Sequence, residues 1–391
     1  MQKLIGCLAI ACWLAPVQAE PFFQSSLIFP MQDMHVHSSS IVQTPDGDFL
    51  ACWFHGSGER TADDVLVQGA RLEQGSAEWS EIFVMANSPG FPDCNPVLFI
   101  DANERLHLFW AGVQANAWQH SLLMHRYSDD YTGGGPPDWK WQEVIRLKPG
   151  DRFAERVDEG FNELESPRSM WAEYAHPYER LLREASRVKI KRQTGWMGRN
   201  QPIQLENGRI ILPVYSDGFN FSLVAYSDDG GETWQASEPI VTYGGVQPAL
   251  AQRENGDIVA FMRDNGDPPK RMQVAISGDD GETWTVGENT DVPNPGSSME
   301  VAALDDGRWA MIHNDLESGR HRLVMALSED EGRTWAHRRV LEDGAPGQTE
   351  YSYPALIQAA DGRLHATYSF GEGGQKAIKH VEFDPDWILE E

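Results

Sequence analysis

Short polar turns alternate with apolar, strand-like runs along most of the chain. Five of the turns contain Asp-Gly or Asn-Gly, and a sixth is degenerate. The segments are "PDGDFLACWF" (45–54), "NERLHLFWAG" (103–112, the degenerate one), "ENGRIILPVY" (206–215), "ENGDIVAFMR" (254–263), "DDGRWAMIHN" (305–314) and "ADGRLHATYS" (360–369). A turn dipeptide flanked by β-branched and aromatic runs is a strong hairpin signal. The pattern therefore predicts six hairpins.

A second repeat indicates how the hairpins are extended. The octamers "SDDGGETW" (227–234), "SGDDGETW" (277–284) and "SEDEGRTW" (328–335) share the spacing Ser-x-Asp-x-Gly-x-Thr-Trp. We interpret this Asp box as a structural turn between a third and a fourth strand, because Ser and Asp can bond local backbone and Trp can pack between sheets. Six repeats of a four-stranded unit predict an all-β, six-bladed β-propeller over residues 20–391.

Residues 151–192 interrupt the repeat. They lack Asn-Gly turns and are rich in Glu, Arg, Leu and Ala. This composition predicts one or two helices inserted between blades 2 and 3. The insertion is either a surface excursion or a lid over the site.

The first 19 residues resemble a secretory signal peptide. A charged start at Lys3 precedes a short apolar run and the small-residue site "VQA" before Glu20. Cys7 and Cys12 stand too early in that run to suit a lipoprotein signal. We expect a periplasmic or secreted protein that begins at about Glu20.

The composition narrows the classes of partner. The chain has 59 acidic and 32 basic residues and a net charge of −27. Such a surface repels phosphate backbones and anionic lipids, which argues against nucleic-acid binding and membrane insertion. No phosphate-binding glycine loop or metal-ligand spacing occurs, so we expect no cofactor and no metal. We expect a monomer, and Cys52 and Cys94 could form one disulfide after export.

Propeller geometry marks candidate site residues without any motif. The inner strands begin around one mouth of the central channel, and the loops after the second strands return to that mouth. The heads of the inner strands are His37, Asn95, Arg199, Asn200, Gln201, Gln247, Ser298, Glu300 and Tyr353. The second-strand ends add Glu59, Arg60, Asp63, Asp64, Trp110, Tyr215, Asp217, Arg263, Asp264, His313, Asn314 and Asp315. Amides, carboxylates, aromatics and arginines together suit a glycan.

The three Asp boxes, with "YSYPALIQAADGRLHATYSF" and "AIKHVEFDPDW", resemble bacterial sialidases and, more closely, the sialidase-like BNR/Asp-box proteins. The resemblance implies a retaining glycosidase. Tyr353, eight residues before the last Asp-Gly, matches the family's nucleophile, and Glu300 or Glu59 would activate it. Asp64 matches the acid/base residue.

The family grips the substrate carboxylate with three arginines, and this chain departs from that pattern. His37 stands at the position of the first arginine and Asn314 at that of the second. Arg320 or Arg322 could supply the third. The further substrate-binding residues expected at the mouth are Arg60, Asn95, Arg199, Asn200, Gln247 and Arg263.

Three functions remain open at this stage. The first is an exo-glycosidase that removes a terminal, acidic sugar from a glycan. The second is a lyase on uronate-containing glycans, with His37 and Tyr353 as base and acid. The third is a glycan-binding propeller without catalytic activity, because a fold alone does not define a function.

Overall fold

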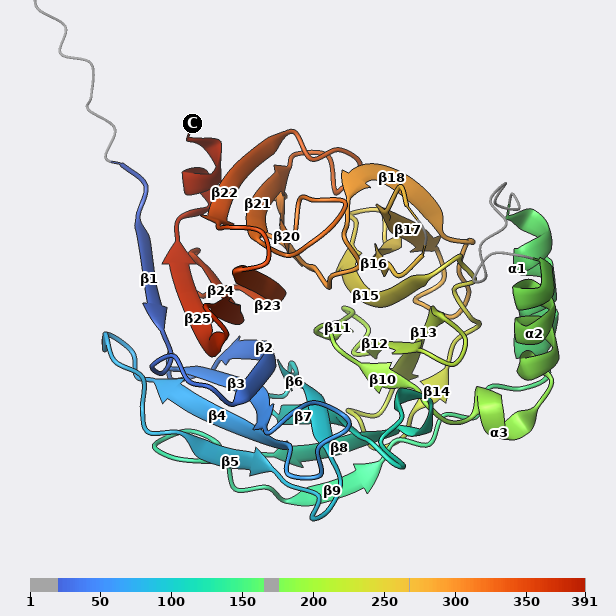
Figure 1. Cartoon of the computed structure of the whole chain (residues 1–391), viewed down its shortest axis with the longest axis horizontal. Coiled ribbons are helices and arrows are strands. Elements are labelled where there is room, and N and C mark those ends of the chain that lie inside the picture. The colour runs from blue at the N-terminus through green and yellow to red at the C-terminus, as the bar shows by residue number, and fades with distance from the viewer. Residues whose placement is uncertain (1–19, 165–175, 267, 391) are drawn as a thin grey trace, which may run out of the picture.

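The computed structural model describes residues 20–164, 176–266 and 268–390, and these form six antiparallel sheets arranged as a ring, five of four strands and one of five (Figure 1). This confirms the predicted six-bladed β-propeller. Blade 1 contains β2 (His35–Gln43), β3 (Phe49–Gly56), β4 (Leu66–Leu72) and β5 (Phe83–Ala86). Blade 2 contains β6 (Asp93–Ile100), β7 (Leu106–Gly112), β8 (Leu122–Ser128) and β9 (Trp141–Val144). Blade 3 contains β10 (Met197–Gly198), β11 (Ile203–Gln204), β12 (Ile210–Ser216), β13 (Phe221–Ser227) and β14 (Gln235–Ala236).

The second half of the ring repeats the arrangement. Blade 4 contains β15 (Gly245–Gln252), β16 (Ile258–Asp264), β17 (Arg271–Ser277) and β18 (Glu288–Pro293). Blade 5 contains β19 (Glu300–Ala303), β20 (Trp309–His313), β21 (Arg322–Ser328) and β22 (His337–Asp343). Blade 6 contains β23 (Thr349–Gln358), β24 (Leu364–Glu372) and β25 (Gln375–Phe383), and its fourth strand comes from the other end of the chain, as β1 (Phe23–Leu27).

The pairing of β1 with β25 closes the ring. The two strands are antiparallel, with Phe23 opposite Phe383. Phe23 also stacks on Trp387 of a short 3-10 helix (Pro385–Leu389), with ring centroids 4.6 Å apart. Both ends of the described chain are thereby held on one blade, and β1 covers the otherwise free edge of β25.

The hairpin turns have the geometry that their sequences predict. The glycines of the five Asp-Gly and Asn-Gly turns have φ between 87° and 94°, a region that glycine enters without steric cost. In the degenerate turn, Glu104 takes the same role with φ 60°. The turns therefore follow from local sequence in all six blades.

Each Asp box is a self-bonded turn. In the first, Asp229 accepts hydrogen bonds from the Thr233 backbone N–H (2.8 Å) and hydroxyl (2.6 Å), and the Ser227 hydroxyl accepts from the Gly231 N–H at 2.9 Å. The same contacts recur in the other two boxes. The boxes link β13 to β14, β17 to β18 and β21 to β22, as the sequence predicts.

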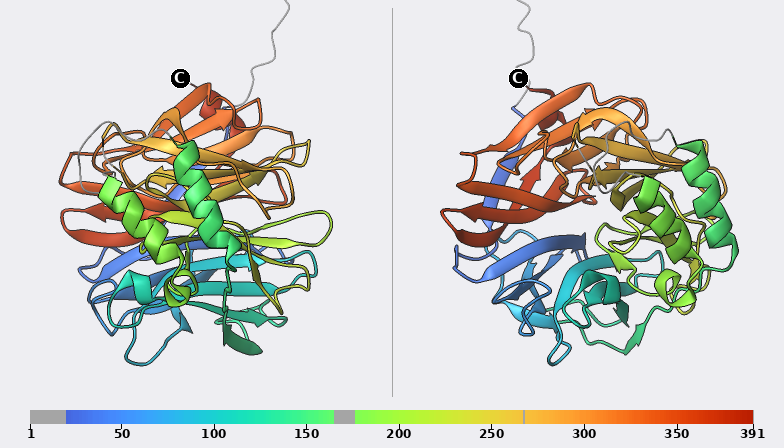
Figure 2. Two further views of the ribbon diagram at one scale, coloured as in Figure 1. Left: turned by 90° about the vertical axis from the view of Figure 1, so that its right-hand side faces the viewer. Right: turned by 45° about the vertical axis from the view of Figure 1, so that its right-hand side comes forward.

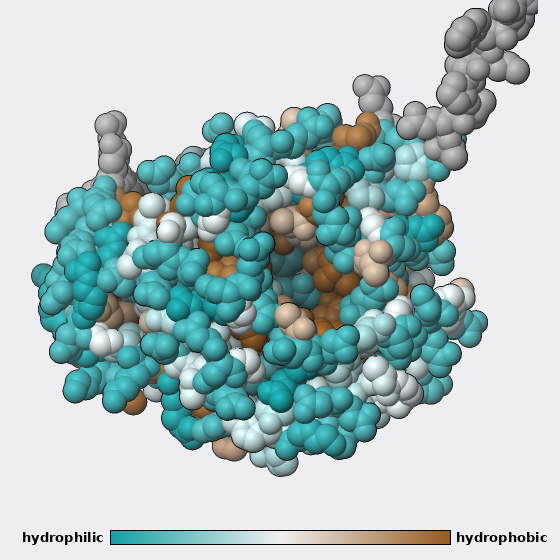
Figure 3. Space-filling view, turned by 180° about the vertical axis from the view of Figure 1, so that it is seen from behind, coloured by the Kyte–Doolittle hydropathy of each residue, from teal (hydrophilic) through white to brown (hydrophobic). Residues whose placement is uncertain are grey.

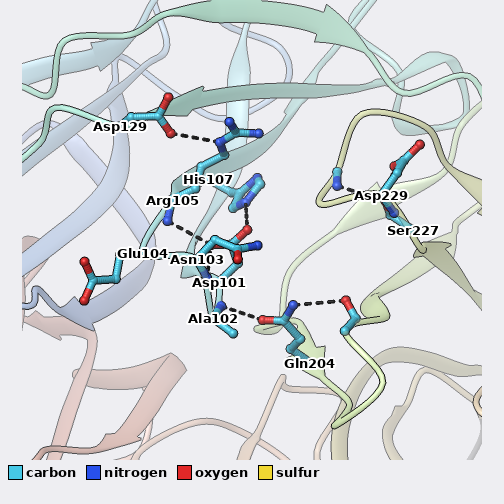
Figure 4. A network of polar contacts seen from close by, with 12 residues as sticks. Asp101, Ala102, Asn103, Glu104, Arg105, His107, Asp129, Gln204, Ser227 and Asp229 are labelled. Carbon is cyan, nitrogen blue, oxygen red and sulfur yellow. Dashed lines mark hydrogen bonds and ion pairs between the residues drawn. The ribbon is translucent and has the colours of Figure 1, made fainter.

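Polar contacts also join neighbouring blades on the turn side of the ring (Figure 4). The Asp101 carboxylate in the blade 2 turn lies 3.5 Å from Nε2 of the buried His107. The adjacent Ala102 N–H donates to the Gln204 side chain of blade 3 at 2.6 Å. The first contact orders the turn within blade 2, and the second joins blades 2 and 3, whose apolar faces also pack together.

The described part of the insertion forms three helices between β9 and β10: α1 (Arg152–Glu163), α2 (His176–Ser186) and α3 (Lys189–Arg192). The helices α1 and α2 lie side by side on the outer edge of the ring (Figure 2). Gly160 faces Val241, where a Cβ atom would lie 2.6 Å from the valine side chain, so α1 approaches blade 3 very closely. Apolar residues of α1 and α2 join the core of blade 3. The insertion is thus packed firmly against the propeller.

Three further expectations from the sequence concern the cysteines, membrane-spanning helices and the signal peptide. Cys52 and Cys94 are both buried and free. Within the described ranges, no helix has the length and apolar character needed to cross a bilayer. The proposed signal peptide, residues 1–19, lies outside the described residues.

Candidate active site

Four inner strands carry a β-bulge that turns one side chain toward the channel mouth. Their pairing with the second strand shifts by one residue, and the bulged residue has positive φ although it is not glycine. The bulged residues are Ser38 (φ 60°), Asn95 (φ 50°), Gln247 (φ 55°) and Tyr353 (φ 53°). Such a backbone costs of order 1 kcal/mol or more per residue and is concentrated at functional sites. Each bulge lies eight residues before the first residue of its Asp-Gly, Asn-Gly or Asn-Glu turn, so the spacing marks it in the sequence.

The phenol of Tyr353 lies at the centre of a polar network. Its oxygen accepts a hydrogen bond from Arg263 Nη1 at 2.8 Å and another from Gln247 Nε2 at 3.3 Å. The Gln247 amide also donates to the Tyr215 oxygen at 3.1 Å, and Asn95 donates to the same oxygen at 3.2 Å. Five predicted mouth residues from four blades are therefore linked in one hydrogen-bond network.

Positive charges surround the Tyr353 ring. The guanidinium of Arg199 lies 5.0 Å and that of Arg320 5.4 Å from the ring centroid. Burial alone would raise the pKa of Tyr353, but the charges of Arg263 and Arg320 bring it below its ordinary value of 10. A phenol in this environment loses its proton more readily than one in water.

Arg320 and Arg263 remain partly exposed, whereas Arg199 is 1% exposed. Arg199 Nη2 donates to the Pro354 carbonyl at 2.8 Å, so this arginine supports the floor under Tyr353. Arg320 forms an ion pair with Glu350 at 3.2 Å. Arg263 and Arg320 are thus the cations that a ligand in the mouth can reach.

The imidazole ring of His37 packs directly against the ring of Tyr353. Its ring centroid lies 4.1 Å from that of Tyr353. Burial, assisted by the charge of Arg320, lowers the pKa of His37 well below 6.5. The imidazole is therefore neutral at physiological pH and can act as a hydrogen-bond donor or a base.

The hydrogen-bond partners of Glu300 do not include the Tyr353 phenol. Its carboxylate accepts hydrogen bonds from Asn200 Nδ2 at 3.2 Å and from the Gln201 N–H at 3.3 Å. Burial raises the pKa of Glu300 to about 7, although the charge of Arg199 acts in the opposite direction. Glu300 also lines a cavity of about 520 Å³ between the inner strands. Seen from behind, the ring is hollowed near its centre and apolar residues line the wall (Figure 3).

The loop after β3 supplies two different carboxylates. Glu59 lies 3.8 Å from Arg60, and burial raises its pKa above 4.5. Its charge also interacts with Arg320 and with Tyr353. Asp64 is exposed and accepts hydrogen bonds from the Ser57 hydroxyl at 2.8 Å and N–H at 3.1 Å, and these bonds lower its pKa. The two carboxylates thus have opposite protonation tendencies.

Two further predicted binding residues have structural partners outside the network. Asn314 donates to the backbone carbonyls of Arg322 and Tyr351, both at 2.8 Å. Arg322 forms an ion pair with Asp343 on the neighbouring strand at 3.0 Å. Arg320, from the loop before β21, is the arginine of this segment that lies over Tyr353. No turn spacing marks that loop, which is why the sequence left Arg320 and Arg322 as alternatives.

Within the described ranges, no group of three or more His, Cys, Asp or Glu side chains has the arrangement of a metal site. The side chains described above give the mouth a phenol, arginines, amides, carboxylates and a neutral imidazole. This set can bind an anionic, hydroxyl-rich molecule and exchange protons with it.

Comparisons with known proteins agree with this architecture. The family model described as "BNR repeat-like domain" matches residues 47–157 and 182–366. A sialidase from Micromonospora viridifaciens is 26% identical over 215 residues, which cover 50% of this chain and 32% of that protein. The match thus spans about a third of that relative's length.

Solved structures share the fold at low sequence identity. A protein of unknown function from Dyadobacter fermentans superposes with a TM-score of 0.66 at 16% identity, covering 93% of this chain and 99% of that one. A sialidase from Streptococcus pneumoniae gives a TM-score of 0.66 at 11% identity, covering 93% and 71%. On the family match, the chain belongs to the sialidase-like family of proteins with BNR repeat-like domains.

Proposed function

We propose that the protein is an exo-glycosidase that removes a terminal acidic sugar from a glycan with retention of configuration. The observation that carries the proposal is the Tyr353 phenol, bonded at 2.8 Å to Arg263 and flanked by Arg320. A phenol with a lowered pKa is a competent nucleophile, and two accessible guanidinium groups suit a sugar carboxylate. The sialidases among the relatives support this class of substrate.

The proposed reaction divides the roles at the mouth among three side chains. Tyr353 attacks the anomeric carbon as the bond to the leaving oxygen breaks, and Glu59 donates the proton that this oxygen needs. Water then displaces tyrosine from the glycosyl-enzyme while Glu59 takes the water's proton. Glu59 suits this role because burial raises its pKa, whereas the bonds from Ser57 keep Asp64 ionised.

Gln247 sets this site apart from a tyrosine activated by a carboxylate. The amide donates its N–H to the phenolic oxygen and accepts from Arg263 at 3.1 Å through its own oxygen. Among the described residues, no carboxylate is hydrogen-bonded to Tyr353. The phenolate is therefore stabilised by positive charge and N–H donors, and its proton leaves to solvent.

A second function is favoured by one observation, the neutral imidazole of His37 packed 4.1 Å from the Tyr353 ring. In a lyase, His37 would remove the proton next to a uronate carboxylate while Tyr353 protonates the leaving oxygen. The arginines would neutralise the carboxylate during β-elimination. The product would then contain a new carbon–carbon double bond that absorbs ultraviolet light.

The test uses a chromogenic aryl α-sialoside, assayed for aryl release, and a 4-O-linked uronate oligosaccharide, assayed for ultraviolet absorbance of an unsaturated sugar product. We expect aryl release by the wild type and a loss of at least about 10³-fold in Tyr353→Phe, since only the phenolic oxygen is removed. Tyr226→Phe is the matched control, because Tyr226 stacks on Arg209 in blade 3, outside the Tyr353 network.

The outcomes separate the three functions. Release that persists in Tyr353→Phe would exclude tyrosine as the nucleophile. An unsaturated product would assign the lyase, and binding of the sialoside without any product would assign the non-catalytic propeller. We also propose export after cleavage before Glu20, which mass spectrometry of the mature N-terminus tests.

A further inference from the structure

A separate cavity lies at the edge of the mouth, where the insertion meets blade 3. Its volume is about 490 Å³. Its walls come from three parts of the chain: Ile190 and Lys191 of α3, His120 of a short 3-10 helix (Trp118–His120) in blade 2, and Asp217 with Gly218 in the loop after β12. None of these elements belongs to the Tyr353 network itself.

The loop 216–220 is a wall shared by this cavity and the mouth. The Asn220 side-chain oxygen accepts a hydrogen bond from Asn265 at 2.8 Å, and Asn265 in turn accepts one from Arg263 at 3.0 Å. The charge of Asp217 interacts with Arg263 and with Arg60. Asp217 therefore lines the cavity and also lies within electrostatic reach of Arg263 in the mouth.

The cavity is preformed because the insertion is rigidly packed. Phe219, in the shared loop, has its ring 5.4 Å from Phe153 of α1 and 5.9 Å from Trp196, which follows α3. Gly195, with φ 80°, approaches the Gln119 backbone so closely that a Cβ atom would lie 2.6 Å from its carbonyl oxygen. Both sides of the cavity are thus fixed to the propeller core.

The insertion is also where positive charge is concentrated on an acidic protein. Residues 180–192 contain six Lys and Arg against one Glu, in a chain of net charge −27. Arg187 pairs with Asp158, and Arg192 donates to Asp151 at 2.6 Å. Lys191 is exposed, lines the cavity and has no ion pair among the described residues.

We infer that this cavity is the leaving-group subsite of the proposed glycosidase and that it takes a second acidic sugar, whose carboxylate pairs with Lys191. The inference rests on the proposed function and adds a substrate class to it: glycans with adjacent acidic residues. Ile190, 66% exposed beside Lys191, supplies an apolar surface for the sugar ring, and Asp217 can accept its hydroxyl groups.

The test compares two glycans with the same terminal sugar. A disialoside places a carboxylate on the second residue, whereas 3′-sialyllactose places a neutral galactose there. The measurement is the ratio of kcat/KM for the two, together with their Kd values for the Tyr353→Phe protein by calorimetry. Lys191→Ala should lower the disialoside preference about tenfold, the size expected for one charge-assisted contact. Lys189→Ala is the matched control, since Lys189 is an exposed lysine on α3 that does not line the cavity.

Each outcome decides the matter. A ratio that falls in Lys191→Ala and stays constant in Lys189→Ala supports the subsite. A ratio that changes equally in both variants, or in neither, overturns the subsite and leaves the proposed function standing. Failure of the wild type to bind either glycan contradicts the proposed function itself, and this inference with it.

Discussion

Glu300 makes the stability of the propeller depend on pH in a direction opposite to that of most carboxylates. It is 2% exposed, and burial raises its pKa to about 7 from the ordinary 4.5. The folded protein therefore binds a proton that the unfolded chain releases at neutral pH. The stabilising effect of that proton is complete below the unfolded pKa and is lost as the pH rises through about 7.

The magnitude follows from the difference between the two pKa values. About 2.5 pH units at about 1.4 kcal/mol each give roughly 3 kcal/mol in total, of which about 2.5 kcal/mol falls between pH 5 and pH 8. Glu300→Gln keeps the shape of the side chain but removes the titration. Its free energy of unfolding relative to wild type should accordingly rise by about 2.5 kcal/mol over that interval.

The assay is urea unfolding followed by tryptophan fluorescence, at about pH 5 and about pH 8, for the wild type and the variant. Any cost of the amide that does not depend on pH cancels in the comparison. Glu232→Gln is the control, because Glu232 is exposed and its charge is hydrated in both states. Equal differences at the two pH values for Glu300→Gln would refute the buried, protonated carboxyl.

Two further predictions concern the phenol and the Asp box. Gln247→Glu replaces the N–H donor 3.3 Å from the Tyr353 oxygen with a carboxylate, which destabilises the phenolate and repels an acidic sugar, so aryl α-sialoside hydrolysis should fall roughly tenfold or more. A folded variant that reacts as fast as the wild type, or faster, would contradict a phenolate stabilised by N–H donors. In Gly332→Ala the new Cβ would lie 2.7 Å from the Phe261 ring, and urea unfolding should show a loss of roughly 2 kcal/mol or more beyond that of Gly362→Ala, which has a similar φ but open space.

Local sequence determined the repeating parts of the fold. A glycine with φ near 90° after Asp or Asn closes each hairpin, and the Asp box bonds to itself within a few residues, so both features are legible in short segments. Blade number and the helical insertion followed from counting those segments. The closing strand β1 did not, because it carries no turn signal and its partner β25 lies at the opposite end of the chain.

The active-site residues also fall into those that local sequence marks and those that it does not. The eight-residue spacing from bulge to turn marks Asn95, Gln247 and Tyr353, since the bulge that recurs in four blades keeps a constant distance from its own turn. The residues that contact the Tyr353 phenol could not be identified from this spacing, because they come from other blades. Gln247 and Arg263 bond to Tyr353, Arg320 lies over its ring, and Glu300 is coupled to Arg199.

The sequence by itself therefore determined the blades, the turns and the residues that each blade offers to the mouth. Only the tertiary structure decided which of those residues touch one another, that Cys52 and Cys94 are free thiols, and that the insertion forms a second cavity beside Asp217. The physical reason is the distance along the chain between the residues that interact. Turn and bulge geometry depends on backbone preferences over a few residues, whereas contacts at the axis depend on how six separate sheets pack into one ring.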